Sequence, residues 1–352
     1  MPVDEILKNA DIPSSRHSKR MDPTKQTCRK SNGGKAARKQ LNSKFARAMD
    51  RMCGRPSLWT ASREGRTVTV RQLLAEEEDV EERGGPRGSS PLCEAALNGH
   101  EDVVVVLLEH GADVSALDTE GRHCLHFAAL QGYEAVVILL IEHAADVSAL
   151  DKEGRAPLHL AASCGHAAAS TLLIEHVADV SAQDNSGCSP LHLAANFGHN
   201  GHAAVIQLLL DKGAEVSAQN HAGEMPIHSA ALHGYEAIVT PLIDHGADLS
   251  AADHSGRAPL HLAAKGGHEA VIQILLDKGA DHQSKTNTGR TPEGVASACS
   301  QPQAAAMLKS HREEVRKIRC VAFAMGHQER LGAGSRVRGL DPGVVQMVME
   351  NV

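Results

Sequence analysis

The hydrophobic positions of this chain form a pattern that returns at a fixed interval. A turn that contains a glycine precedes a short apolar segment with two adjacent alanines. A second glycine follows, and after it comes an apolar segment with helical spacing, as in residues 103–108. The leading glycines are 33 residues apart except for one 36-residue step; they are Gly88, Gly121, Gly154, Gly187, Gly223, Gly256 and Gly289. Such a period is typical of solenoids, in which pairs of short helices stack on their neighbours.

Each unit contains the start and stop signals of two helices. In the unit that begins at Gly154, Pro157 suits the first turn of a helix, where an N–H group has no partner to lose. Leu158 should face the core, and Gly165 stands where a helix ends in the left-handed conformation. A second helix should follow and end near His176.

The phrase at residues 151–182 closely resembles the ankyrin repeat, with Pro-Leu-His-Leu-Ala-Ala after the turn, Gly-His between the helices and Ala-Asp-Val-Ser-Ala after the second helix. The resemblance covers residues 56–310, approximately. It implies an all-α solenoid of helix–turn–helix units with hairpin loops. Counting gives about eight units, with a degenerate first unit at 58–80, six clear units over 88–280 and a truncated last unit at 289–308. Atypical outer units are typical of end caps.

Several units depart from the family pattern, and we expect these departures to weaken the array. The residue before the proline lacks a capping hydroxyl in three units, at Ala156, Met225 and Ala258, and Cys124 replaces the proline itself in another. The glycine after the second helix is replaced by Ala144 and Val177, and a non-glycine residue in the left-handed conformation costs about 1–2 kcal/mol. Pro241 interrupts a second helix. We predict local opening near residues 144, 177 and 241.

The longer step between units comes from residues 198–202, Gly-His-Asn-Gly-His, which look like a small duplication in the loop between two helices. Such an insertion should reach the surface without breaking the stacking.

The 22 histidines suggest a metal site, but the repeat explains them better. The resemblance implies that one set ties neighbouring loops together by hydrogen bonds; it comprises His126, His159, His192, His228 and His261. A second set ends the second helices, near the negative end of the helix dipole; it comprises His110, His143, His176 and His245. No ligand set or catalytic motif stands outside the repeat, so we expect no metal, no cofactor and no enzymatic activity.

Charge is distributed unevenly along the chain, whose net charge is -7. Residues 1–55 hold 14 Lys and Arg against 5 Asp and Glu, whereas residues 56–352 hold 22 against 38. A basic tail on an acidic body can bind an outside polyanion or enzyme, or fold back onto the repeats. Aromatic residues make up only 2%, which disfavours base stacking by the repeats.

Part of this basic tail, residues 24–47, resembles the N-terminal tail of histone three at most positions and without a gap. The resemblance implies modification sites at positions that match modified histone residues; these are Lys25, Lys30, Ser31, Lys35, Lys39 and Lys44. An alternative function is then a chromatin-related histone-tail mimic whose lysines are a substrate or decoy for histone-modifying enzymes. Such enzymes, or nucleic acid, are candidate partners of residues 16–55. The alternative is that a histone-like fragment was joined to an ankyrin gene and has no selected role.

The cysteines and the apolar runs indicate the compartment. The eight cysteines are scattered, without a Cys-x-x-Cys pair, and no secretory signal or membrane-spanning run is present. We therefore expect an intracellular protein, cytoplasmic or nuclear, that does not contact membranes. At the carboxyl end, residues 311–352 form a helical segment, with a long helix over 303–329 and a short one over 341–348, that should dock on its own body.

A solenoid presents an extended surface and lacks a closed catalytic pocket, which favours binding over turnover. We predict a non-enzymatic scaffold that binds another protein with the hairpin tips and the concave face of the first helices. The contact residues are expected where the units differ: Glu120, Arg122, Gln131, Lys152, Arg155, Ser163, Asn196, Phe197, Glu224, His233, Arg257 and Lys265. Simple solvated surface is the alternative for each of them.

Overall fold

The computed structural model describes residues 56–198 and 201–331. Sixteen helices, α3 to α18, follow one another in these residues, and the only β-structure among them is an isolated bridge between Gly84 and Ser89. The expected all-α class is therefore confirmed. The basic segment 1–55, with its histone-like stretch, and the short helix expected over 341–348 lie outside the described residues.

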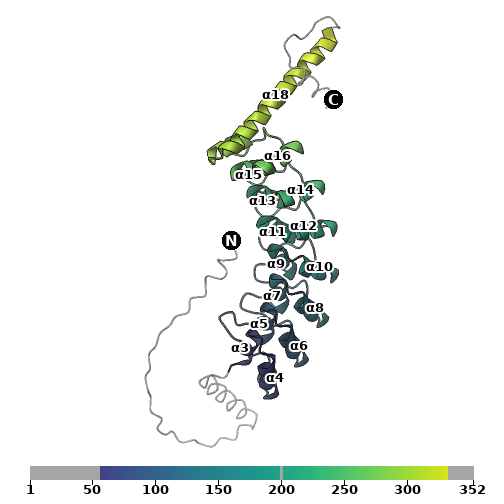
Figure 1. Cartoon of the computed structure of the whole chain (residues 1–352), viewed down its shortest axis with the longest axis vertical. Coiled ribbons are helices and arrows are strands. Elements are labelled where there is room, and N and C mark those ends of the chain that lie inside the picture. Colours follow the sequence, from purple (N-terminus) through teal and green to yellow (C-terminus); the bar gives the residue numbers. More distant parts are fainter. Residues whose placement is uncertain (1–55, 199–200, 332–352) are drawn as a thin grey trace, which may run out of the picture. The chain divides into compact units, whose positions relative to one another are not determined.

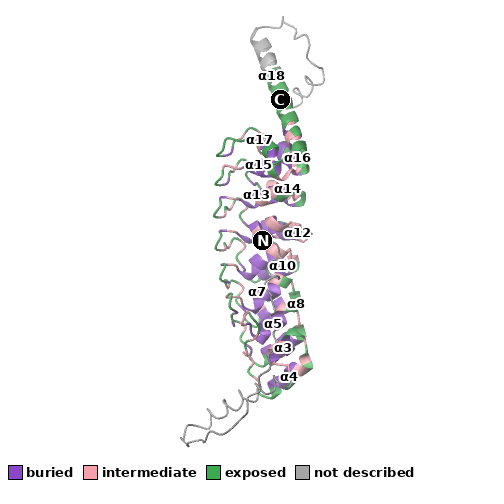
Figure 2. Ribbon diagram, turned by 90° about the vertical axis from the view of Figure 1, so that its left-hand side faces the viewer, coloured by how far each residue is buried: buried purple, intermediate pink, exposed green. Residues whose placement is uncertain are grey.

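The helices of residues 58–298 form two layers (Figure 1). The first layer consists of α3 (Leu58–Arg63), α5 (Pro91–Leu97), α7 (Cys124–Gln131), α9 (Pro157–Cys164), α11 (Pro190–Phe197), α13 (Pro226–His233), α15 (Pro259–Gly266) and α17 (Pro292–Ala298). The second layer consists of α4 (Thr67–Ala75), α6 (Glu101–Glu109), α8 (Glu134–Glu142), α10 (Ala167–Glu175), α12 (His202–Asp211), α14 (Glu236–Asp244) and α16 (Glu269–Asp277). Hairpin loops join successive units and project from one side of the stack (Figure 2).

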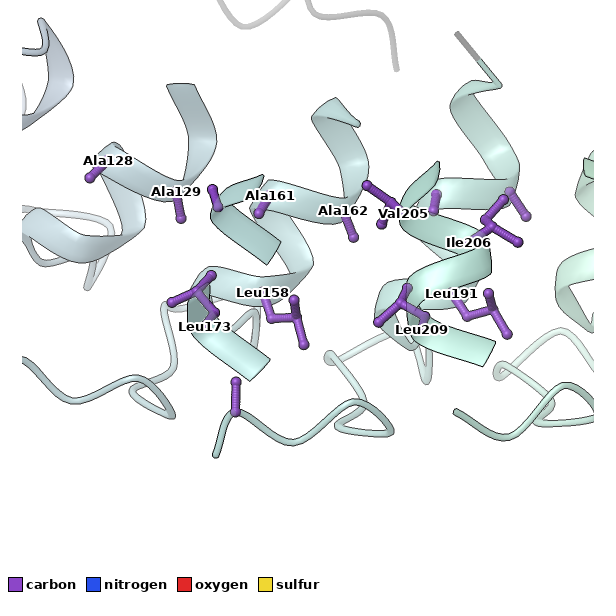
Figure 3. Packing of buried hydrophobic residues seen from close by; sticks show 14 of the residues in the cluster. Ala128, Ala129, Leu158, Ala161, Ala162, Leu173, Leu191, Val205, Ile206 and Leu209 are labelled. Atoms are coloured by element: carbon purple, nitrogen blue, oxygen red, sulfur yellow. The ribbon is translucent and has the colours of Figure 1, made fainter. Parts of the chain in front are cut away.

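The core runs through the stack as one continuous cluster. Figure 3 shows how it repeats: Leu158 of α9 and Leu173 of α10 are fully buried, and the small side chains of Ala161 and Ala162 let neighbouring helices approach closely. Each unit buries one side against the unit before it and the other against the unit after it. Removal of a leucine such as Leu158 should therefore cost about 2–5 kcal/mol.

The first-layer helices begin at proline in six units, as predicted. Ala156, Met225 and Ala258 supply no capping side chain. The histidine three residues on bonds to the N–H group of the residue before the helix, as it also does in the unit that keeps Ser189. Nδ1 of His159 accepts the N–H of Ala156 at 3.1 Å, and the same bond recurs in the other two units. The missing hydroxyl is thus confirmed, while the free N–H group before the helix keeps a partner.

The expected left-handed residues are also confirmed. Ala144 and Val177 have φ values of 62° and 69°, the conformation that glycine adopts at the same place in the neighbouring units. Val177 is 85% exposed, so no burial compensates for the strain of a β-branched side chain in this conformation. Pro241 lies inside α14, where its ring nitrogen has no hydrogen to donate.

The insertion in the fifth unit leaves the stack continuous. Gly198 ends α11 in the left-handed conformation, and α12 begins at His202. Helices α10, α12 and α14 still pack against one another in order. Gly201 lies so close to the backbone carbonyl of Gly165 that a Cβ atom there would be 2.1 Å from the oxygen.

Helix α18 (Pro302–Leu331) confirms the long helix predicted over 303–329. Its first turns pack on the array through the buried residues Ala304 and Leu308. The helix then continues past residue 310, so it belongs both to the last unit and to the segment that follows. From Lys309 to Cys320 its side chains are exposed or half-buried (Figure 2).

Candidate functional site

A buried aspartate, Asp118, Asp151 or Asp253, shapes three of the hairpins. Oδ1 of Asp151 accepts the backbone N–H groups of Glu153 and Arg155 at 3.0 and 2.8 Å, and Oδ2 accepts two hydrogen bonds from the Arg155 guanidinium at 2.9 and 2.8 Å. Asp118 with Arg122, and Asp253 with Arg257, repeat this ion pair. Three of the predicted contact residues, Arg122, Arg155 and Arg257, therefore hold their own hairpins together.

Neighbouring hairpins are joined by backbone hydrogen bonds near their tips. The N–H of Lys152 donates to the carbonyl of Glu120 at 2.9 Å, and Asn185 bonds to Glu153 in the same way in the next unit. The side chains of Glu120 and Lys152 remain exposed. Glu224 is half-buried, and its carboxylate lies 3.4 Å from the Arg257 guanidinium of the next hairpin. These bonds place predicted contact residues of successive units side by side.

The other six predicted residues lie in the last two turns of the first-layer helices: Gln131, Ser163, Asn196, Phe197, His233 and Lys265. Gln131, His233 and Lys265 are exposed. Ser163 donates its hydroxyl back to the carbonyl of Leu160 at 2.9 Å, and the ring of His233 stacks on Tyr235 with 5.6 Å between the centroids. None of the twelve predicted residues belongs to the buried core. The structure thus groups them in two rows, one along the hairpins and one along the helix ends.

Two exposed apolar side chains on the hairpins were not among the predicted contact residues. Leu117 and Leu150 occupy equivalent positions in adjacent hairpins and are 48% and 57% exposed. The next two units have Gln183 and Gln219 at this position. Comparing the same position across units is the signal that would have found them, because a leucine on an otherwise polar hairpin has no core to enter.

The buried histidines act as the resemblance implied, so this prediction is confirmed. Nε2 of His126, His159, His192, His228 and His261 donates to a backbone carbonyl of the following unit, at 3.0–3.2 Å. Burial lowers the pKa of all five below the ordinary value of 6.5. The imidazoles therefore remain neutral in the folded protein at neutral pH.

A second set of histidines forms hydrogen bonds in the opposite direction, to a carbonyl of the preceding unit. Nε2 of His166 donates to the carbonyl of Leu130, and His268 donates to Leu232 in the same way, at 3.0 and 2.9 Å. His100 and His202 make the equivalent bonds. Each ring packs over a glycine at or just after the end of the preceding first-layer helix.

The helix-ending histidines His110, His143, His176 and His245 instead bond to the carbonyl four residues earlier through Nδ1. These four side chains are therefore bound to the backbone. The described residues contain no cluster of three His, Cys, Asp or Glu side chains that could hold a metal ion.

The six cysteines in the described part of the chain are free thiols. Cys93 and Cys124 are buried, and burial raises the pKa of the Cys93 thiol to about 12, so it stays protonated and unreactive. Among the described helices, none has both the length and the apolar character that crossing a membrane requires.

Comparison with solved structures supports the fold. The ankyrin repeat domain of human ASB11 is similar, with a TM-score of 0.59 and 28% sequence identity; the match covers 64% of this chain and 99% of that domain.

Curated relatives match over short stretches only. Palmitoyltransferase AKR1 of Lachancea kluyveri is 42% identical over 66 residues, or 19% of this chain, and palmitoyltransferase ZDHHC17 of Danio rerio is 38% identical over 61 residues, or 17%. The matched stretches cover 9% and 10% of those two proteins. The similarity therefore carries no transferase activity over to this chain.

The family model for ankyrin repeats in three copies matches most of the chain, in overlapping sections at residues 28–118, 58–151, 125–220, 176–253, 192–286 and 227–318. Ankyrin repeats form protein–protein interaction domains, and their fold is typically not catalytic. The stacked helix pairs, the hairpins and the two sets of histidine hydrogen bonds agree with this match. The chain belongs to the ankyrin repeat family.

Proposed function

We propose that the chain is a non-enzymatic scaffold that binds another protein with the hairpin tips and the ends of the first-layer helices. One observation carries this proposal: the frame repeats from unit to unit, while the side chains above it change. Equivalent helix-end positions hold Ser163, Asn196 and Lys265 on helices that otherwise share the same core residues. A repeated frame with changing side chains provides a surface that can match one partner.

The two rows are chemically mixed in the way that protein interfaces usually are. The exposed leucines Leu117 and Leu150 offer apolar contact area, and the exposed charges of Glu120 and Lys152 lie on the same hairpins. An apolar centre with a polar rim is the common anatomy of a binding surface. The ion-paired arginines beneath contribute by keeping the hairpins rigid, which reduces the entropy lost on binding.

The experiment compares Leu117→Ser combined with Leu150→Ser against a matched control, Ile138→Ser. Ile138 is a 40% exposed apolar residue on α8 of the second layer. Tagged full-length proteins would be purified from cells, and the co-purifying proteins would be quantified by mass spectrometry. The proposal expects a protein that is enriched with the wild type and the control but lost with the double variant. Equal recovery with all three proteins would contradict it.

A further inference from the structure

A cavity of about 850 Å³ lies between the last hairpin and α18. Lys285 lines it from the hairpin, and Arg312, Arg316 and Arg319 line it from the helix. We propose that this cavity, the end groove, binds a short acidic or phosphorylated peptide segment of a partner protein. This site is separate from the hairpin tips and the helix ends, and it does not depend on their role.

The groove exists because α18 leaves the array. The helix packs on α17 and α16, and its last buried side chain is Leu308. The described side chains beyond this residue touch the array only at its surface, through His311 and Arg312. Arg312, Arg316 and Arg319 are spaced by four and three residues, which places them on one face of the helix. The rings of His282 and His311 meet edge to face, with 5.2 Å between centroids, and connect the hairpin to the helix beside the groove.

The groove is basic although the repeats are acidic. Glu313 is the only carboxylate among the lining residues, and Arg312 pairs with Glu293 at 2.8 Å. Lys285, Arg316 and Arg319 are exposed and form no ion pair within the described residues. Like charges at these helical spacings destabilise a helix, and a bound anion removes that repulsion.

The lining indicates what kind of anion fits. Arginine side chains bind carboxylates and phosphates through two parallel hydrogen bonds, and arginine clusters are a common means of recognising acidic or phosphorylated motifs. The aliphatic side chain of Val315 adds apolar surface to the groove. No aromatic ring lines the cavity for base stacking, and residues 56–352 hold 38 acidic against 22 basic residues, which disfavours a long nucleic acid. A short anionic peptide needs neither an aromatic ring for stacking nor a basic surface beyond the groove.

The test measures binding of a fluorescein-labelled peptide of Asp, Glu and phosphoserine residues to the full chain by anisotropy. A peptide with Asn, Gln and Ser at these positions is the ligand control. The variant Arg316→Gln with Arg319→Gln removes two groove charges. The matched protein variant is Lys309→Gln with Lys317→Gln, because these exposed lysines lie on the same helix but do not line the groove. Circular dichroism checks that both double variants keep their helices.

The inference expects the anionic peptide alone to bind, with affinity reduced about tenfold or more by the groove variant and little by the control. Equal loss in the two double variants would overturn it, because general charge attraction would then explain binding. Equal binding by the wild type and the groove variant would also overturn it, since the peptide would then bind outside the groove. Tighter binding of a single-stranded oligonucleotide of equal charge would assign the groove to nucleic acid instead. None of these outcomes depends on Leu117 or Leu150, so the proposed function is tested separately.

Discussion

Nε2 of His159 lies 3.2 Å from the carbonyl oxygen of Cys188, in the hairpin that follows. Nδ1 of the same ring accepts the backbone N–H of Ala156. One nitrogen therefore donates and the other accepts, which only the neutral imidazole can do. Protonation of Nδ1 would break the bond to Ala156, and four other units repeat this arrangement or a close variant of it.

The five buried histidines, His126, His159, His192, His228 and His261, predict that the array loses stability in mild acid. Because burial lowers the pKa of these imidazoles below 6.5, the unfolded chain takes up protons at a higher pH than the folded chain does. Their stabilising contribution is thus complete above about pH 6.5 and is lost as the pH falls toward the lowered values. Each histidine can remove up to about 1.4 kcal/mol per pH unit within that window. The urea midpoint should be clearly lower at about pH 5.5 than at about pH 7.5.

The variant His159→Gln removes one of these five imidazoles. It should lower the stability at about pH 7.5 by about 1–2 kcal/mol and reduce the pH dependence. If the variant and the wild type showed equal pH dependence of stability, the pKa of this imidazole would be the same in the folded and unfolded chains, which would contradict the prediction.

Glycine at position 177 should stabilise the protein. Val177 adopts a left-handed conformation at φ 69° while 85% exposed, so Val177→Gly relieves strain and loses little burial. The expected gain in the free energy of unfolding is about 1 kcal/mol, and amide exchange near residue 177 should slow. The reverse substitution, Gly213→Val, supplies the control, because Gly213 has φ 84° and free space around it. A loss of stability in Val177→Gly would refute the strain argument.

A methyl group at Gly201 should be poorly tolerated. Its Cβ would lie 2.1 Å from the carbonyl oxygen of Gly165, a backbone atom that cannot move away cheaply. We expect Gly201→Ala to cost about 1–3 kcal/mol in a urea unfolding experiment. Gly294→Ala, with its nearest atom at 3.5 Å, should be neutral or slightly stabilising. Similar midpoints for the two variants would show that the insertion is not packed against the preceding unit.

Features set by local sequence were predictable. Proline at the first helical turn, the left-handed Ala144 and Val177, and the long helix near residue 303 all depend on a few consecutive residues. The ties made by the buried histidines followed from the family resemblance. Once the period was recognised, stacking of equal units extended these local predictions to most of the chain.

The surface was less predictable, since its chemistry depends on contacts across the hairpins. The position of Arg155 varies between units, and the sequence analysis did not anticipate that its guanidinium bonds to Asp151, four residues earlier. That spacing within a turn was a signal that could have indicated the pair. The end groove could not be predicted, because it depends on the direction in which α18 leaves the last unit, and a pattern of helical positions does not encode this direction.

The histone-like segment gives a prediction that is independent of the fold. If residues 24–47 act as a substrate, histone lysine methyltransferases and acetyltransferases should modify the full-length protein at Lys25, Lys30, Lys35, Lys39 or Lys44. Changing all five lysines to arginine should abolish the modification seen by mass spectrometry. An unmodified, folded sample would favour a fused fragment without this role.

Site-specific photo-crosslinking tests the central claim, that a partner binds the hairpin tips and the first-layer helix ends. A benzoylphenylalanine residue would replace Lys152 or Lys265 on this surface, and Gln207 or Gln273 on the second layer; all four side chains are exposed. After irradiation in cells, the account predicts one cross-linked protein at the first two positions and little at the other two. Equal cross-linking on both layers, or cross-linking at the second layer alone, would contradict it.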